Sequence, residues 1–515
     1  MTAKPAQTGQ GMATSTTIAG SRTEHRGLAY WMERVLKELE KVRTSADVDA
    51  VHDLRVAIRR CRSVAAVMEE VDPHASWNEM RKYPRKLFRA LGELRDTQVL
   101  EEWVGKLSTE GDPIRQRLLL EFSKREKELG EEVGRVAAKF EPKSWKKYER
   151  ALRKRAHLVP PDSSAAECLA LERLEAAKEL HARALRTTKP GAWHELRIGV
   201  KKFRYTVESL LPARYETWGE DLKRVQDLLG EVHDLSVLAE KIELVATIEV
   251  QESKDAWKER LASETTSRLE TYRQLTLGKT NLYQDWRAGL PQGERLELAG
   301  IARLRATARA LDENVRRSNR VSALAMRLYG GLTRAHAAPI FGNPKLRRVM
   351  RAAARLHGIG SGLDSKKPEK AARDLLLQME APAGWTAEEW RLVATIVRYH
   401  RGVQPQEKHK GFAELNEEER GKVCACAGIL RLARALRKYG VETTVGVKVE
   451  KSVDAVIVRV PGLVDTEETA AGMAAGKHLL ETCIGCPLIL KRGDIGKVVE
   501  LKKVTERVET AVASD

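Results

Sequence analysis

The sequence of 515 residues is poor in aromatic side chains and in cysteine, and it has no long apolar run. Its six cysteines are too few for a disulfide framework in a chain of this length. No segment approaches the roughly 20 consecutive apolar residues that cross a bilayer. The N-terminal residues also lack the apolar core of a secretory signal. We therefore expect a cytoplasmic protein without a membrane-spanning segment.

Positive charge is in clear excess. Lysine and arginine number 91 against 73 aspartates and glutamates, which gives a formal net charge of +18. This excess implies a polyanionic partner, and composition does not choose among polyphosphate, nucleic acid and a membrane surface. Charged residues make up 32% of the chain, and abundant alanine, leucine, glutamate, lysine and arginine favour a mainly helical fold.

One basic stretch, residues 52–62, returns as residues 194–204. At 3.6 residues per turn, each copy places a histidine and three cations on one helix face, beside an apolar stripe that can seat the helix on a core. Solvated faces usually mix charges, because like charges one turn apart destabilise a helix. Repetition of the same row therefore favours a face that binds a repeating anion. The rows are His52, Arg55, Arg59 and Arg62, and His194, Arg197, Lys201 and Arg204.

A second segment is also paired. Residues 91–96 read Leu-Gly-Glu-Leu-Arg-Asp, and residues 229–234 read Leu-Gly-Glu-Val-His-Asp. Each is followed by a Val-Leu pair at the same spacing. Further cations precede both copies, and they are Arg85, Lys86 and Arg89 in the first and Lys223 and Arg224 in the second.

With these paired motifs, residues 23–290 resemble the CHAD domain, a conserved-histidine α-helical family built from two such repeats. The Pro160-Pro161 break separates the predicted repeats, which cover about 23–158 and 165–290. The resemblance implies binding of inorganic polyphosphate through basic helix faces. The implied binding residues are His52, Arg55, Arg59, Arg62, Arg85, Lys86, Arg89, His194, Arg197, Lys201, Arg204, Lys223 and Arg224.

The second half resembles the helical C-terminal part of exopolyphosphatases and guanosine-pentaphosphate phosphohydrolases, which has an HD-like fold. We expect a disordered tail over 1–22, a linker over 291–317, a degenerate HD-like helical domain over 318–440, and a small α/β end piece over 441–515. Alternating valines predict strands near 445–449 and 456–460. The predicted fold class is thus mainly α.

Departures from the HD pattern bear on the chemistry. A catalytic HD domain holds metal ions with a His-Asp pair and further His and Asp residues, but here the pair reads His357-Gly358. The segment 365–370 brings lysines instead of histidines, and Arg434 stands at the late aspartate position. We therefore expect no metal, no cofactor and no HD-type hydrolysis. The family's actin-like catalytic half has no counterpart in this sequence.

Other motifs carry little chemistry. Cys483-Ile484-Gly485-Cys486 lacks a second ligand pair nearby, and Cys424 and Cys426 lie on an apolar helix pattern.

The leading hypothesis is non-catalytic polyphosphate binding, with the C-terminal part as a scaffold or a contact for proteins of polyphosphate metabolism. The alternatives are a phosphohydrolase of polyphosphate or guanosine pentaphosphate, and a nucleic-acid-binding protein. Location on polyphosphate granules stays open.

Overall fold

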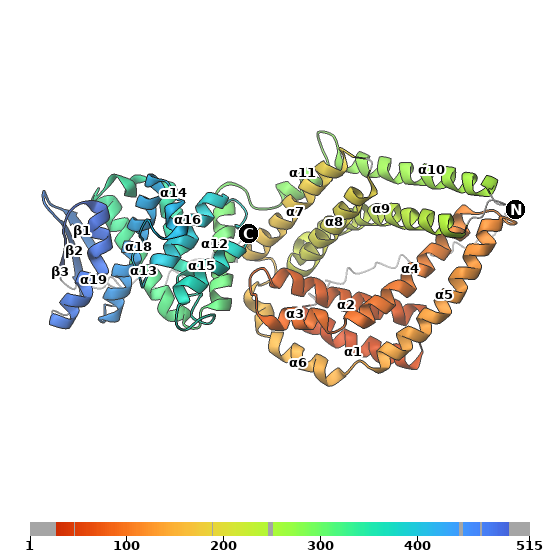
Figure 1. The fold of residues 1–515 in the computed structure, drawn as a ribbon, viewed down its shortest axis with the longest axis horizontal. Helices are drawn as coiled ribbons and strands as arrows, with labels where there is room; N and C mark the ends of the chain where they lie inside the picture. Colours follow the sequence, from red (N-terminus) through yellow and green to blue (C-terminus); the bar gives the residue numbers. More distant parts are fainter. Residues whose placement is uncertain are drawn as a thin grey trace, which may run out of the picture.

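The computed structural model describes residues 27–45, 47–187, 189–245, 251–441, 446–463 and 466–493. The predicted disordered tail and the end of the α/β piece, residues 494–515, lie outside the described residues. The described chain is mainly helical, as predicted, with one small sheet near its C-terminal end (Figure 1).

The first repeat is an all-helical unit. Helix α2 begins at Asp47, whose side chain accepts a hydrogen bond from the backbone N–H of Ala50 at 2.8 Å, as an N-cap should. The elements of this repeat are α1 (Leu28–Thr44), α2 (Val48–Met68), α3 (Ala75–Lys82), α4 (Arg85–Leu107), α5 (Pro113–Ala138), α6 (Pro142–Leu152) and the 3-10 helix η1 (Arg155–Leu158).

The second repeat follows the same plan. Its basic helix begins with Pro190 in the first turn, where a missing N–H costs nothing. The predicted apolar stripes of both basic helices are confirmed, because their residues are buried in a shared core. The elements are α7 (Ser164–Ala184), α8 (Pro190–Leu210), α9 (Pro212–Val245), α10 (Gln251–Thr276) and α11 (Leu282–Ala288).

The two repeats meet at two places. The basic helices α2 and α8 pack against each other, and their apolar stripes share one core. The long pairs α4–α5 and α9–α10 extend away from this contact and meet again near their far ends (Figure 1). A second, smaller core that includes Trp103, Phe122 and Trp257 fills the far contact. Both contacts fix the distance between the repeats.

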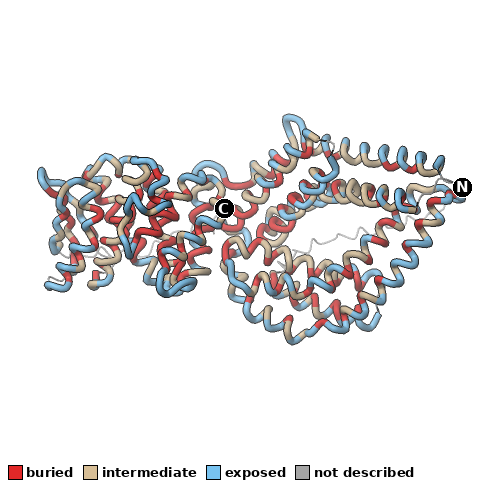
Figure 2. Tube along the Cα trace, viewed as in Figure 1, coloured by how far each residue is buried: buried red, intermediate tan, exposed pale blue. Residues whose placement is uncertain are grey.

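The C-terminal part is a separate helical unit with its own core (Figure 2). Residues 291–317, assigned to a linker from the sequence, contain helix α12, which packs against α7 of the preceding repeat. Arg303 of α12 pairs with Glu172 of α7 at 3.2 Å. The helices are α12 (Gly293–Leu311), α13 (Val315–Arg334), η3 (Pro339–Gly342), α14 (Pro344–Leu356), α15 (Pro368–Gln378), α16 (Ala387–Tyr399), α17 (Lys410–Ala413) and α18 (Glu417–Lys438).

A three-stranded sheet ends the described chain. Strands β1 (Lys448–Lys451) and β2 (Val456–Pro461) are antiparallel, and β2 is parallel to β3 (Leu488–Gly493). Helix α19 (Glu467–Ile484) connects the parallel pair and packs on α18. The alternating valines of 456–460 form β2 as predicted, whereas Val445 lies outside the described residues. The exact domain boundaries stay predictions.

Candidate functional site

The contact between α2 and α8 is built around one aromatic ring. The guanidinium of Arg59 lies 5.5 Å from the centre of the Tyr205 ring, and those of Arg60 and Arg204 lie 5.8 Å and 5.9 Å from it. Arg60 also pairs with Glu208, whose side chain is 13% exposed. Cations from both repeats are therefore held against a buried tyrosine, which favours them through its ring face.

Lys201 is the electrostatic centre of this region. Burial, together with the charges of Arg197, Arg59 and Arg55, lowers its pKa to about 7. Two of these arginines belong to α2 and one belongs to α8, so the predicted rows of the two repeats converge. We call Arg55, Arg59, Arg197 and Lys201 the central cluster. Its concentration of like charge needs a compensating anion.

Two aspartates from the paired motifs face the central cluster. Arg55 of α2 lies 3.5 Å from the Asp96 carboxylate of α4. Burial raises the pKa of Asp234 in α9 to about 6, while the charge of Arg197 opposes that rise and the charge of Asp96 adds to it. The equivalent aspartates of the two repeats thus lie near each other and near cations of the same cluster. They orient the cluster without neutralising it, since four cations face two carboxylates.

The predicted histidines lie at the beginning of the basic helices. Burial lowers the pKa of His52, with the charges of Arg59 and Arg95 as further causes. The ring of His194 lies 4.7 Å from that of His233, centre to centre. Burial holds the pKa of His233 at about 4, so this imidazole is neutral at pH 7. His52 and Arg95 thus occupy in one repeat the place that His194 and His233 occupy in the other.

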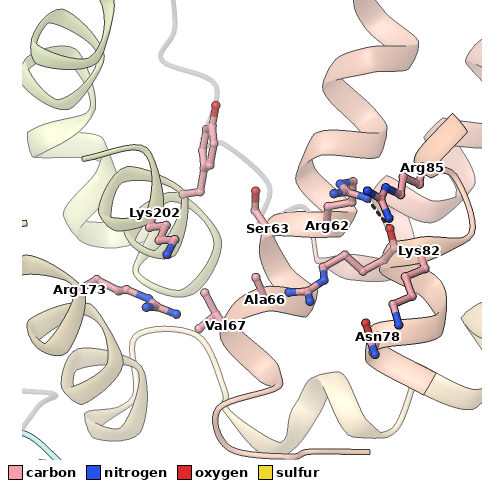
Figure 3. Close-up of a pocket in the computed structure, with 11 residues that line it drawn as sticks. Arg62, Ser63, Ala66, Val67, Asn78, Lys82, Arg85, Arg173 and Lys202 are labelled. Atoms are coloured by element: carbon pink, nitrogen blue, oxygen red, sulfur yellow. Dashed lines mark hydrogen bonds between the residues drawn. The ribbon is translucent and has the colours of Figure 1, made fainter. Parts of the chain in front are cut away.

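A basic cleft of about 480 Å³ lies at the other end of the α2–α8 contact (Figure 3). In Figure 3 Arg173 and Lys202 approach it from one side, and Arg62, Lys82 and Arg85 line the opposite side. None of its lining residues is a carboxylate within the described ranges of the chain. The basic residues of the cleft are Arg62, Arg81, Lys82, Arg85, Arg173 and Lys202.

Neighbouring groups fix half of these cleft cations. Arg62 donates to the carbonyl of Arg81 and lies 4.9 Å from the ring centre of Phe88. Arg81 pairs with Glu69 at 2.8 Å, and Arg173 pairs with Glu70 in the turn that follows α2. Within the described part of the protein, Lys82, Arg85 and Lys202 have no ion-pair partner. These three side chains remain available to a bound anion.

The structure does not bring every predicted residue into these two groups. Lys86 and Arg89 are exposed on α4, and Arg89 pairs with Glu93 at 3.0 Å. Lys223 and Arg224 are exposed on α9. Arg204 joins the Tyr205 contact at 5.9 Å from the ring centre, and Arg62 belongs to the basic cleft. The exposed cations can extend a binding surface but are not part of its built centre.

Sequence reasoning missed several residues of the site. Lys202 was visible in the repeated basic motif, because it directly follows Lys201. Tyr205 had a weaker signal as an aromatic residue beside the row. Arg173 on α7 and Lys82 on α3 had none, because their positions do not repeat and only the packing of α3 against α2 and of α7 against α8 brings them to the cleft.

The region expected to be a degenerate HD centre lies in the C-terminal unit. His357 and His400 are buried, with ring centres 5.2 Å apart. Their Nδ1 atoms hydrogen-bond to the carbonyls of Ala354 and Val397 at 2.8 Å and 2.6 Å. Burial lowers the pKa of His357 to about 4. Among the described residues there is no group of three or more His, Cys, Asp or Glu side chains placed to hold a metal ion.

Gly358 explains why a carboxylate cannot simply be restored there. A Cβ atom at this position would collide with the carboxylate of Asp312 and the hydroxyl of Ser318. The room that an HD aspartate needs is therefore filled by a side chain from the segment before α13. The departure from the HD pattern therefore involves the residues that surround Gly358 as well as Gly358 itself.

Comparison with known proteins agrees with this division of the chain. Residues 27–243 match the family model of the CHAD domain, and residues 302–460 match that of the Ppx/GppA phosphatase, domain III. The crystal structure of the CHAD domain from the plant Ricinus communis is similar at 19% identity and a TM-score of 0.34. That similarity covers 51% of this chain and 88% of the plant chain. No curated protein matches. No described helix has the length and apolarity needed to cross a membrane.

Proposed function

We propose that this chain, which joins a CHAD domain over residues 27–243 to a Ppx/GppA phosphatase domain III over residues 302–460, binds inorganic polyphosphate without cleaving it. The observation that carries the proposal is the central cluster. Cations from the same motif in two repeats converge on one place, where burial and the neighbouring cations hold the pKa of Lys201 at about 7 although Asp234 acts in the opposite direction. A polyanion supplies further counter-charge.

The arrangement suits a chain of phosphates better than a single anion. Polyphosphate carries a charge on every unit, so the central cluster and the basic cleft can engage successive units of one molecule. Arginine binds phosphate oxygens in pairs through its planar fork, and lysine adds a point charge. Several modest contacts made by one chain add to a strong overall affinity. Nucleic acid would instead be favoured by aromatic side chains open to stacking, whereas Tyr205 is buried.

The proposed role of the C-terminal part is to scaffold the binding domain or to contact other components of polyphosphate metabolism. The buried Arg303–Glu172 pair at the junction of the two parts supports a fixed attachment between them. A phosphohydrolase is the competing function. Release of phosphate from polyphosphate by the purified chain, in the presence of Mg²⁺ or Mn²⁺, would exclude the non-catalytic proposal.

The test of polyphosphate binding is a competition at fixed ionic strength. Labelled long-chain polyphosphate is displaced by unlabelled polyphosphate, duplex DNA or single-stranded RNA. The quadruple variant neutralises the whole central cluster by glutamine substitution at Arg55, Arg59, Arg197 and Lys201.

The control removes the same charge from exposed positions of α5 and α6, with glutamine at Lys124, Lys127, Lys146 and Lys147. We expect polyphosphate to compete best, and its advantage to disappear only in the quadruple variant. Equal competition by all polyanions, or equal losses in both variants, would refute the proposal.

A further inference from the structure

A second basic cleft lies in the C-terminal unit, where α13 meets α18. Its volume is about 370 Å³. The lining residues come from the beginning of α13 and the end of α18, and no carboxylate lies among them within the described residues. They are Asn314, Arg316, Arg317, Arg320, Arg437 and Lys438. An isolated surface rarely gathers so much charge of one sign without a ligand, because like charges repel.

Arg434 lies directly beside this cleft. It precedes Arg437 and Lys438 by one turn of α18, so the three side chains share one side of the helix. Burial, together with the charges of Arg401 and Arg317, lowers the pKa of Arg434 to about 10. Arg317 therefore belongs to the cleft and also lies close enough to act on Arg434. The cleft and the partly exposed Arg434 are therefore neighbours, joined through Arg317.

Arg434 also lacks a counter-charge of its own. In the described chain no carboxylate or carbonyl accepts a hydrogen bond from its guanidinium. The one carboxylate that acts on it, Glu369, is already shared between Arg398 and Arg401, each at 3.6 Å. Arg434 is partly exposed, so a bound anion can reach its guanidinium and supply the acceptor that the described residues do not.

The neighbouring groups exclude a cation. Arg434 faces His357 and His400, and its charge contributes to the lowered pKa of both histidines. Arg431, one turn earlier on α18, donates to the carbonyls of Tyr399 and Gly402 at 2.8 Å and 2.9 Å and so fixes the loop beside them. The region where an HD enzyme gathers its metal ligands is therefore positively charged in this chain.

We propose that the α13–α18 cleft, with Arg434 at its inner side, is a second binding site that takes a single phosphate group. This proposal goes beyond polyphosphate binding by the CHAD domain and does not depend on it. Arg434 and Arg317 would bind the phosphate oxygens, and Arg316, Arg320 and Lys438 would surround the entrance. The phosphate group comes either from free inorganic phosphate or from the end of a condensed phosphate chain.

The experiment uses the full chain with the central cluster and the three unpaired cations of the basic cleft, Lys82, Arg85 and Lys202, already neutralised, so that the CHAD domain contributes little. Inorganic phosphate and tripolyphosphate are titrated separately by calorimetry at constant ionic strength. We expect one saturable site per chain and at least tenfold weaker binding after Arg317→Gln and Arg434→Gln. The matched control, Lys345→Gln with Arg347→Gln, removes two exposed charges from α14 and should bind like its parent.

The two probes distinguish the sources. Binding of inorganic phosphate assigns the site to free phosphate, and binding of tripolyphosphate alone assigns it to a chain end. Absence of a saturable site for either probe, or equal affinity in the Arg317/Arg434 variant and the α14 control, would overturn the proposal. If the Arg434 variant does not fold, Arg320→Gln with Lys438→Gln at the entrance replaces it, with the same expected loss.

A failure of this site is separable from a failure of the CHAD-domain proposal. The second site is tested by the Arg317 and Arg434 substitutions in the neutralised background. Polyphosphate binding by the CHAD domain is tested by the quadruple variant with the α13–α18 cleft intact. The two experiments change different sites. Each result therefore tests one of the two proposals and leaves the other unaffected.

Discussion

Lys201 should make polyphosphate binding depend on pH. In the free protein its pKa is about 7, against an ordinary value of 10.5, because it is buried among cations. A bound polyanion replaces the missing counter-charge and raises that pKa again. Binding is therefore linked to proton uptake, and affinity must fall as pH rises through 7.

The size of the effect follows from the pKa. With a value of about 7, roughly nine-tenths of Lys201 is protonated at pH 6 and about one-tenth at pH 8. If the bound state stays protonated throughout, affinity falls about tenfold between pH 6 and pH 8, or about 1.4 kcal/mol. Asp234, with a pKa of about 6, adds a dependence of the same sign at lower pH.

The assay is fluorescence anisotropy of labelled long-chain polyphosphate at constant ionic strength from pH 6 to 8.5. Long chains make the titration of their end groups negligible. Calorimetry in two buffers of different ionisation enthalpy counts the protons taken up. Lys201→Arg keeps the charge at all these pH values and should flatten the curve above pH 7, whereas Lys223→Arg at an exposed site should not. An unchanged slope in Lys201→Arg would refute the reasoning.

Three further predictions concern the α2–α8 contact. Tyr205→Phe should bind polyphosphate like the native chain in the anisotropy assay, because the buried hydroxyl has no hydrogen-bond partner in the described residues. Tyr205→Ala should release Arg59 and Arg204 and lose about 3 kcal/mol of stability, which urea unfolding measures. Glu208→Gln leaves Arg60 buried without a counter-charge and should destabilise the fold by about 3 kcal/mol, and a melting temperature equal to that of the native chain would contradict this. Polyphosphate affinity should fall linearly on a double-logarithmic plot against salt, with a shallower slope in the quadruple variant than in the α5–α6 control.

Much of the architecture follows from local pattern. Apolar residues such as Leu54 and Phe203 recur at helical spacing and are fully buried as predicted. The repeated motif places the same side chains at the same positions of two helices, so the convergence of Arg59 and Lys201 needs only that the repeats pack face to face. The valines of β2 recur at the two-residue period of a strand, so this element also follows from local pattern.

The remaining features of the fold and the site depend on contacts between distant parts of the sequence, which no local pattern predicts. Arg173 and Lys82 reach the basic cleft only because α7 packs against α8 and α3 packs against α2. Lys86 and Arg224 match in sequence but lie exposed on α4 and α9, because sequence spacing gives the face of a helix and not the surface it meets. The lack of room beside Gly358 depends on Asp312, which is distant from it along the chain.

The central claim is that cations of both repeats form one polyphosphate site. A calorimetric titration with a short polyphosphate of defined length tests it most directly, on Arg55→Gln/Arg59→Gln and on Arg197→Gln/Lys201→Gln, each in a chain that also carries Arg317→Gln and Arg434→Gln. A shared site predicts that either half-variant keeps the stoichiometry of its parent and binds more weakly. Loss of one site in each half-variant, with unchanged affinity at the other, would contradict it.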